Sequence, residues 1–344
     1  MANKAPSRWY GVRPAFWIAG GIALLGFGII SGVAFDIATQ PVPKPSEHVF
    51  RASPKEVSRP PLVTLPSDNS DSILQRPAPE EHVERPVTPT PELEPQPVAK
   101  PETPLVAYAV PTKVARERPV IAIVLDDMGL DRVRALKAVD LPGPLTVSFM
   151  TYADGLSALV PQAREHGHEV LAHLPMEPID AKENPGPGAL TVKMDDATIQ
   201  KTIAADLDSW KGYVGINNHM GSKFTRDKAR MAVVMTELKS RGLLWLDSKT
   251  IAGSAGIDTA KAASVPFLER DVFLDNIDTQ AEVVKQLANT VAIAKKSGTA
   301  IAIGHPHDAT LTVLKQWLPT LEAQGVSLVP VTEILKRRQP ATRE

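Results

Sequence analysis

Short apolar runs alternate with amphipathic stretches along residues 119–338. The apolar runs have the length and composition of buried strands, and the stretches between them repeat their apolar positions about every 3.6 residues, as helices do. Strands are predicted at 120–125, 145–149, 169–172, 213–216, 243–246, 299–303 and 326–329, with a weaker strand within 264–274. Helices are predicted at 131–139, 155–166, 196–210, 226–241, 279–297 and 308–323.

This alternation predicts an α/β fold, and specifically an irregular (β/α) barrel of seven to eight units. A doubly wound open sheet is the second choice. Glycines stand where helix C-caps are expected, at Gly167, Gly242, Gly298 and Gly325. No predicted strand is followed by a Gly-x-Gly-x-x-Gly loop, which argues against nucleotide binding.

The N-terminal region has the pattern of a membrane anchor. Residues 15–35 carry no charged side chain and are long enough to cross a bilayer as one helix, and residues 1–14 carry three basic residues and no acid. A cleaved signal peptide has a shorter apolar region, so we expect a single-pass inner-membrane anchor with the following domain in the periplasm. Gly28 and Gly32 have a spacing that can pack two such helices together, although ordinary membrane-helix glycines are the simpler interpretation.

Residues 36–118 differ in composition from the rest of the chain. They hold 17 of its 32 prolines and few aromatic residues. Such a segment buries too little apolar surface to offset the entropy of ordering it, so a disordered, partly polyproline-like linker is expected. The globular domain is placed at 119–338, followed by a short tail at 339–344.

Composition narrows the chemistry that this domain can perform. The chain contains no cysteine, which excludes disulfides, thiolate nucleophiles and cysteine-based zinc sites. The formal net charge is -1 and no basic stripe is present, so nucleic acid is not an expected partner.

Two adjacent carboxylates end the first predicted strand. In VIAIVLDDMG, residues 120–129, the apolar run stops at Asp126 and Asp127. Ligands of parallel α/β folds bind at the carboxyl ends of the strands, where one carboxylate can hold a metal and its neighbour can move a proton. The alternative, an N-cap for the next helix, would account for only one of the two residues.

Polar side chains also follow the other predicted strands. They are His173, then Asn217, Asn218 and His219, then Asp247 and Ser248, and finally His305 and His307. Four of the six histidines of the globular region therefore lie at one end of the predicted sheet. A parallel sheet would bring them together, and a set of carboxylates and imidazoles predicts a site for zinc or a similar divalent metal.

Six short motifs around these positions resemble those of one protein family. They are VLDD at 124–127, GHEVLAH at 167–173, HLPMEP at 173–178, NNHMGS at 217–222, WLDS at 245–248 and IAIGHPH at 301–307. As a set they look most like the divergent polysaccharide deacetylase family, over about residues 119–336. The resemblance implies that Asp127 and His173 hold a metal, that Asp126 is the catalytic base and that His305 is the general acid.

The motifs depart from the usual family pattern at two places. Where a second metal-binding histidine is usual, four residues after the first, this chain has Glu177. His219 is the expected replacement ligand, with Glu177 as the alternative. The usual arginine motif that orients the catalytic aspartate is replaced by NNHMGS, so Asp247 is a candidate for that orienting role, although a helix or turn cap is an equal alternative for it.

The remaining polar residues at the strand ends are given supporting roles. Substrate binding, or hydrogen bonding to the residues that contact the substrate or metal, is expected of Asn218, Ser248 and Glu177. Ser248 lies in no nucleophile elbow, so a hydrogen-bonding role is expected. His307 is either a partner of the site or a neighbour of the next helix start.

Together with the predicted membrane anchor, the resemblance implies a membrane-anchored, zinc-dependent hydrolase that removes acetyl groups from an acetylated envelope polysaccharide or peptidoglycan-like glycan. Asp127, His173 and His219 would hold the zinc, which activates water; Asp126 would take the proton of the attacking water and His305 would protonate the leaving sugar amine. The alternative is a catalytically inactive carbohydrate-binding or scaffold module with the same fold.

Overall fold

A computed structural model describes residues 102–339 of the chain. The predicted membrane helix at 15–35, with Gly28 and Gly32, and most of the predicted linker lie outside the described residues. Within 102–339, no helix combines the length and the apolar character needed to cross a bilayer.

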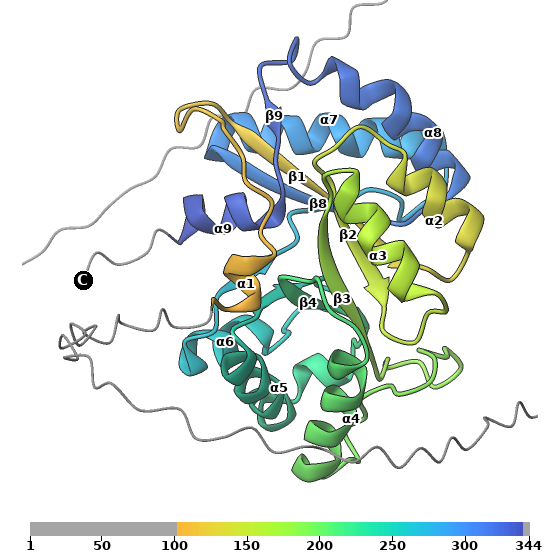
Figure 1. The fold of residues 1–344 in the computed structure, drawn as a ribbon, viewed down its shortest axis with the longest axis vertical. Helices are drawn as coiled ribbons and strands as arrows, with labels where there is room; N and C mark the ends of the chain where they lie inside the picture. Colours follow the sequence, from red (N-terminus) through yellow and green to blue (C-terminus); the bar gives the residue numbers. More distant parts are fainter. Residues whose placement is uncertain (1–101, 340–344) are drawn as a thin grey trace, which may run out of the picture. The chain divides into compact units, whose positions relative to one another are not determined.

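Parallel strands form the centre of the domain (Figure 1). Their spatial order is β6-β5-β4-β3-β2-β1-β8-β7, and β9 pairs with the start of β1. The strands are β1 Val120–Met128, β2 Thr146–Met150, β3 Glu169–Met176, β4 Gly215–Met220, β5 Leu244–Asp247, β6 Phe267–Glu269, β7 Val272–Phe273, β8 Thr299–Gly304 and β9 Ser327–Leu328. From β6 to β1 the order follows the chain without the reversal that a doubly wound sheet would show, so the barrel prediction holds and the second choice does not.

The two ends of the sheet are joined by two residues of the chain. β6 pairs with β5 at one end, β7 pairs with β8 at the other, and only Arg270 and Asp271 separate β6 from β7. Asp271 fixes this connection, because its backbone N donates to the Ile301 carbonyl at 2.9 Å and its Oδ2 accepts from the Ile301 N at 2.7 Å. The weak strand predicted within 264–274 is therefore two short strands, and the barrel is irregular at this point.

Most of the helices pack on the outside of the sheet (Figure 1). The helices of the described residues are α1 Pro104–Ala107, α2 Arg132–Val139, α3 Leu156–Glu165, α4 Asp196–Asp208, α5 Lys228–Arg241, α6 Gly256–Ala263, α7 Gln280–Ser297, α8 Asp308–Trp317 and α9 Val331–Arg338. Asp131, Asp195 and Asp227 cap three of them through side-chain hydrogen bonds, as their sequence positions suggest. The helix predicted at 308–323 is shorter, because Pro319 lacks the N–H needed to continue it.

Alternating side chains of β1 pack into two separate apolar clusters. Ile121, Ile123 and Leu125 face the helices, whereas Val120, Ala122 and Val124 face an inner cluster that includes Ile334 and Leu335 of α9. The first residues of α9 lie at the amino ends of the strands, since Val331 N donates to Thr146 Oγ1 at 3.2 Å. Helix α9 therefore packs against the amino end of the barrel and leaves its carboxyl end to the polar residues.

The end of the predicted linker is ordered against the domain, contrary to expectation. The guanidinium of Arg337 donates to the backbone carbonyls of Val114, Ala115, Arg116 and Arg118, at distances of 2.8–3.3 Å. The backbone N of Val110 donates to Glu169 Oε2 at 3.2 Å. These contacts are made by the backbone of the segment, so its proline-rich composition did not reveal them.

Candidate active site

A bulge at the end of β1 places two consecutive aspartates in one cavity. The pairing of β1 with β2 shifts register between Leu125 and Met128, and Asp127 has a left-handed backbone with φ 57°. Neighbouring side chains of a regular strand point to opposite faces, but the bulge turns both carboxylates the same way. Asp126 and Asp127 therefore both line a cavity of about 390 Å³ at the carboxyl ends of the strands.

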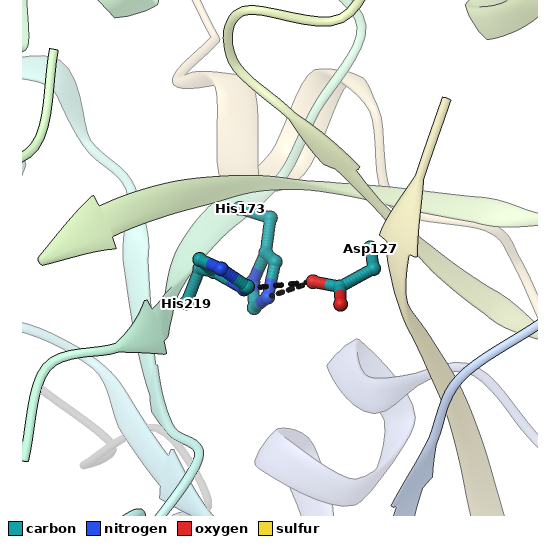
Figure 2. Close-up of side chains that lie close together, drawn as sticks. All are labelled: Asp127, His173 and His219. Carbon is teal, nitrogen blue, oxygen red and sulfur yellow. Dashed lines mark ion pairs between the residues drawn. The ribbon is translucent and has the colours of Figure 1, made fainter. Parts of the chain in front are cut away.

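Three candidate metal ligands meet in this cavity (Figure 2). Asp127 Oδ1 of β1 lies 3.3 Å from His173 Nε2 of β3 and 2.8 Å from His219 Nδ1 of β4. Asp127 Oδ1 is buried and makes no hydrogen bond of acceptable geometry. A carboxylate oxygen and two imidazole nitrogens that converge without hydrogen-bonding one another form a donor set that fits zinc or a similar divalent ion.

The charges around Asp127 also favour a ligand in its ionised form. Burial alone would raise the pKa of Asp127, but the adjacent imidazoles of His173 and His219 hold it well below its ordinary value. A carboxylate that stays ionised over the physiological pH range is ready to bind a cation.

Asn217 connects the predicted base to a predicted metal ligand. Its Nδ2 donates to Asp126 Oδ1 at 2.8 Å and to Ser248 Oγ at 3.1 Å. Its Oδ1 accepts from Ser148 Oγ at 2.5 Å and pairs with His173 Nδ1 at 2.8 Å. Because the amide N–H must face the carboxylate, the amide oxygen faces His173 and requires a proton on Nδ1, which leaves Nε2 free to bind a metal.

Asp126 is almost completely buried beside these groups. Its side chain lies 3.7 Å from His173 Nε2, and burial raises the pKa of Asp126 above its ordinary value, although His173 and His305 act in the opposite direction. A carboxylate with a raised pKa accepts a proton more readily than an exposed one, which suits a general base.

An aspartate that no sequence argument identified holds His305. Asp275 Oδ1 pairs with His305 Nδ1 at 3.0 Å, and Asp275 Oδ2 accepts from the His305 backbone N at 2.6 Å and from Thr310 Oγ1 at 2.8 Å. Burial lowers the pKa of His305, but the Asp275 hydrogen bond and charge outweigh burial and raise it to about 9. The free Nε2 of His305 lies 4.0 Å from Asp127 Oδ2, so a protonated imidazole faces the candidate metal site.

Two predicted residues lie outside this constellation. Asp247 accepts hydrogen bonds from Lys249 N at 2.8 Å and Ser254 Oγ at 2.7 Å, so it fixes the loop after β5 and does not orient Asp126. Glu177 pairs with Lys223 Nζ at 2.6 Å and accepts from Val192 N at 2.8 Å. Because the loop after β4 and its own loop both bind this carboxylate, His219 and not Glu177 joins Asp127 and His173 in the candidate ligand set.

The other predicted residues lie beside the cavity. Asn218 Oδ1 accepts from Ser248 N at 3.0 Å, which ties the ends of β4 and β5 together, and both residues line the cavity. Ser248 also accepts from Asn217, in agreement with the expected hydrogen-bonding role. His307 is partly exposed and its ring lies 5.6 Å from that of His305, at the N-cap position of α8.

Asn217 was among the polar residues predicted at the strand ends but was given no role, whereas Asp275 and Arg270 were not predicted as parts of the site. Asn217 precedes His219 by two residues and therefore shares its strand face, which is a signal that strand periodicity could have supplied. Asp275 and Arg270 follow β7 and β6, which are too short to give a clear apolar pattern. No sequence signal marked their position.

Comparisons with known proteins identify the domain. Residues 123–335 match the family model described as divergent polysaccharide deacetylase. The chain is 33% identical over 222 residues to the uncharacterized protein YibQ of Escherichia coli, which covers 64% of this chain and 69% of YibQ. It is 34% identical over 201 residues to an uncharacterized Haemophilus influenzae protein, which covers 58% of this chain and 71% of that one. The crystal structure of an uncharacterized Agrobacterium tumefaciens protein has a TM-score of 0.66 and 30% identity, covering 67% of this chain and 95% of that one.

Proposed function

This chain belongs to the divergent polysaccharide deacetylase family, and we propose that it is an active, metal-dependent hydrolase that removes acetyl groups from an envelope polysaccharide. The main support for the proposal is that a candidate metal-ligand set, a candidate base and a candidate acid lie together in one cavity. The ligand set is Asp127, His173 and His219, and Asp126 and His305 lie beside it. A module that only binds carbohydrate has no need of a buried base or of a histidine held by a carboxylate.

The residues divide the proposed reaction between them. Zinc or a similar ion held by Asp127, His173 and His219 would activate water near neutral pH and polarise the acetyl carbonyl. Asp126, held by Asn217, takes the proton from the attacking water. His305, kept protonated by Asp275, donates a proton to the leaving sugar nitrogen. The products are acetate and a free amino sugar.

We also propose that the protein is a single-pass inner-membrane protein with this domain in the periplasm, where envelope glycans are found. The support is the uncharged stretch at 15–35 with basic residues before it. Protease treatment of spheroplasts would test it, because only an external domain is digested while the inner membrane is intact.

Two measurements test the proposed activity. Metal content of the full-length protein should be about one zinc-like ion per chain and should be lost in His173→Ala and His219→Ala. His166→Ala, which removes an exposed imidazole on the end of α3, is the matched control and should retain the ion. Asp126→Asn should retain the metal and lose acetate release from N-acetylated oligosaccharides by at least about 100-fold. A wild-type protein that binds metal and glycan and releases no acetate would instead be the inactive binding module.

A further inference from the structure

Arg270 lines the same cavity as the candidate metal ligands and is held rigidly there. Its Nε donates to the Ser248 carbonyl at 2.7 Å and its Nη2 to the Lys249 carbonyl at 2.9 Å. The guanidinium also lies over the ring of Phe273, with Cζ 4.9 Å from the ring centroid. These contacts are to neutral groups, so they position the arginine without neutralising its charge.

Within residues 102–339, no acidic side chain forms an ion pair with Arg270, although the acids on either side of it are paired. Glu269 binds Lys249 at 3.3 Å, and Asp271 binds Arg338 at 2.5 Å. Asp126, Asp127 and Glu183 line the same cavity, but none of them forms an ion pair with Arg270. A divalent cation held there would balance the charges of the two aspartates. Among the described residues, the guanidinium therefore lines the cleft as a cation without an ion-pair partner.

The guanidinium has the geometry of an anion site. Its two backbone hydrogen bonds use Nε and one N–H of Nη2, and Nη1 makes no hydrogen bond within the described part of the chain. The edge formed by Nη1 and Nη2 is one of the two edges through which a guanidinium can bind a carboxylate or phosphate with two parallel hydrogen bonds.

The position of Arg270 indicates which part of a substrate it would meet. Phe273 lies between the two cationic groups, since its ring also contacts the ring of His305 edge to face, with centroids 5.6 Å apart. Arg270 is thus one aromatic ring away from the histidine that protonates the leaving amine. A group bound by Arg270 would belong to the sugar side of the bond that breaks, and not to the acetyl side.

We propose that Arg270 binds a negatively charged substituent of the glycan, so that the substrate is an acetylated glycan carrying a carboxylate or phosphate on the reacting sugar or its neighbour. This inference rests on the proposed function, because it names the substrate class of that same site. A neutral N-acetylated glycan would leave a half-buried cation in the cleft without a partner, which disfavours its binding.

The test compares two oligosaccharides of equal length with the full-length, metal-loaded protein. One is a neutral N-acetylhexosamine oligomer, and the other carries a carboxylate on alternate sugars. The wild type should have the higher kcat/KM for the carboxylated oligomer. Arg270→Gln should lower the carboxylated-to-neutral ratio of kcat/KM by about 10–100-fold, and Arg270→Lys should give an intermediate ratio.

Lys249→Gln is the matched control. It removes one positive charge beside the cleft from a side chain that does not line the cavity, and it should leave the ratio unchanged. A wild type without preference, an equal loss on both oligomers in Arg270→Gln, or an equal change of the ratio in Lys249→Gln would each overturn the proposal.

A failure of the proposed function can be told apart from a failure of this inference. If the wild type releases acetate from neither oligomer, the proposed hydrolase function is wrong. The anion site is then tested separately, by calorimetric binding of the carboxylated oligomer. Binding weakened about tenfold or more in Arg270→Gln and unaffected in Lys249→Gln would support the site. Equal affinity of wild type and Arg270→Gln would overturn it, with thermal unfolding of the variant showing that it is folded.

Discussion

Asn217 donates its side-chain N–H to Asp126 at 2.8 Å, and this one hydrogen bond fixes the direction of the whole amide. The opposite end of the amide then holds His173 Nδ1 at 2.8 Å. The proposed base and a candidate metal ligand therefore share a single support, in place of the arginine of the usual family pattern. A change in this support is felt at two places in the proposed reaction.

We expect Asn217→Ala to impair both metal binding and turnover. His173 loses the group that selects its tautomer, and Asp126 loses a hydrogen-bond donor, so metal affinity should fall about 10–100-fold and kcat should fall further at saturating metal. Metal titration followed by acetate-release assays at saturation would separate the two effects. Asn289→Ala, on the exposed side of α7, is the control. Loss of metal affinity with full kcat at saturation would show that Asn217 does not position Asp126.

Asp275→Asn should reduce turnover and leave metal binding intact. The variant removes the negative charge beside His305, so the pKa of His305 falls and less of the imidazole is protonated near neutral pH. We expect kcat to fall by about 100-fold or more, since a general acid is lost. Asp278→Asn, near the partly exposed His307, should have little effect. A variant of Asp275 with normal kcat would remove His305 from the reaction.

Glu177→Gln should retain the metal, in contrast to His219→Ala. The carboxylate of Glu177 is bound to Lys223 and to the backbone of its own loop, away from the ligand set. The expected cost is a loss of about 1 kcal/mol or less in the free energy of unfolding, because the ion pair is partly exposed. Equilibrium dialysis with zinc checks the first point and urea unfolding checks the second. Loss of zinc from Glu177→Gln would reinstate this residue as a ligand.

Glu169 should make the domain less stable as the pH rises. It is fully buried, and burial raises its pKa from 4.5 to about 7 despite hydrogen bonds from Thr332 and Val110. The folded protein binds this proton more tightly than the unfolded chain, so the contribution to stability is complete below pH 4.5 and is lost as the pH rises through about 7. The loss is on the order of 3 kcal/mol.

Urea unfolding between pH 5 and pH 8 would measure this effect. Glu169→Gln should have a flatter dependence of the unfolding free energy on pH than the wild type, because glutamine does not titrate. Glu165→Gln, an exposed acid on the end of α3, should follow the wild type. Equal slopes for Glu169→Gln and wild type would show that Glu169 does not carry the expected proton.

Long apolar runs made most of the fold predictable from the sequence. The runs of β1 and β8 are continuous because both faces of each strand are buried, and strong helix caps such as Asp227 and Gly242 mark where α5 begins and ends. The strands β6 and β7 have three and two residues, which is too short for any periodicity, so the short connection between the two ends of the sheet could not be predicted.

The candidate ligands could be proposed from the sequence because the motifs mark them, but the residues that support them could not. Within GHEVLAH, only His173 belongs to the site. His168 is buried at the other end of β3, where its Nδ1 accepts from Leu145 N at 3.1 Å, and Glu169 binds Thr332. A sequence motif contains both residues that take part in the site and residues that only pack in the core, and the sequence alone does not distinguish them. The supports of Asp126 and His305 come from distant strands, and only the folded chain shows that Asn217 and Asp275 reach them.

The left-handed backbone of Asp127 lowers the stability of the fold at a residue that the proposed function requires. A non-glycine residue in this conformation costs on the order of 1 kcal/mol, so Asp127→Gly would relieve strain in the metal-free protein and remove a ligand at the same time. A screen for heat-resistant variants without metal would favour glycine at this position, whereas a screen with metal present would eliminate it. The two screens together would separate residues that stabilise the metal-free fold from residues that destabilise it and are needed to bind the metal.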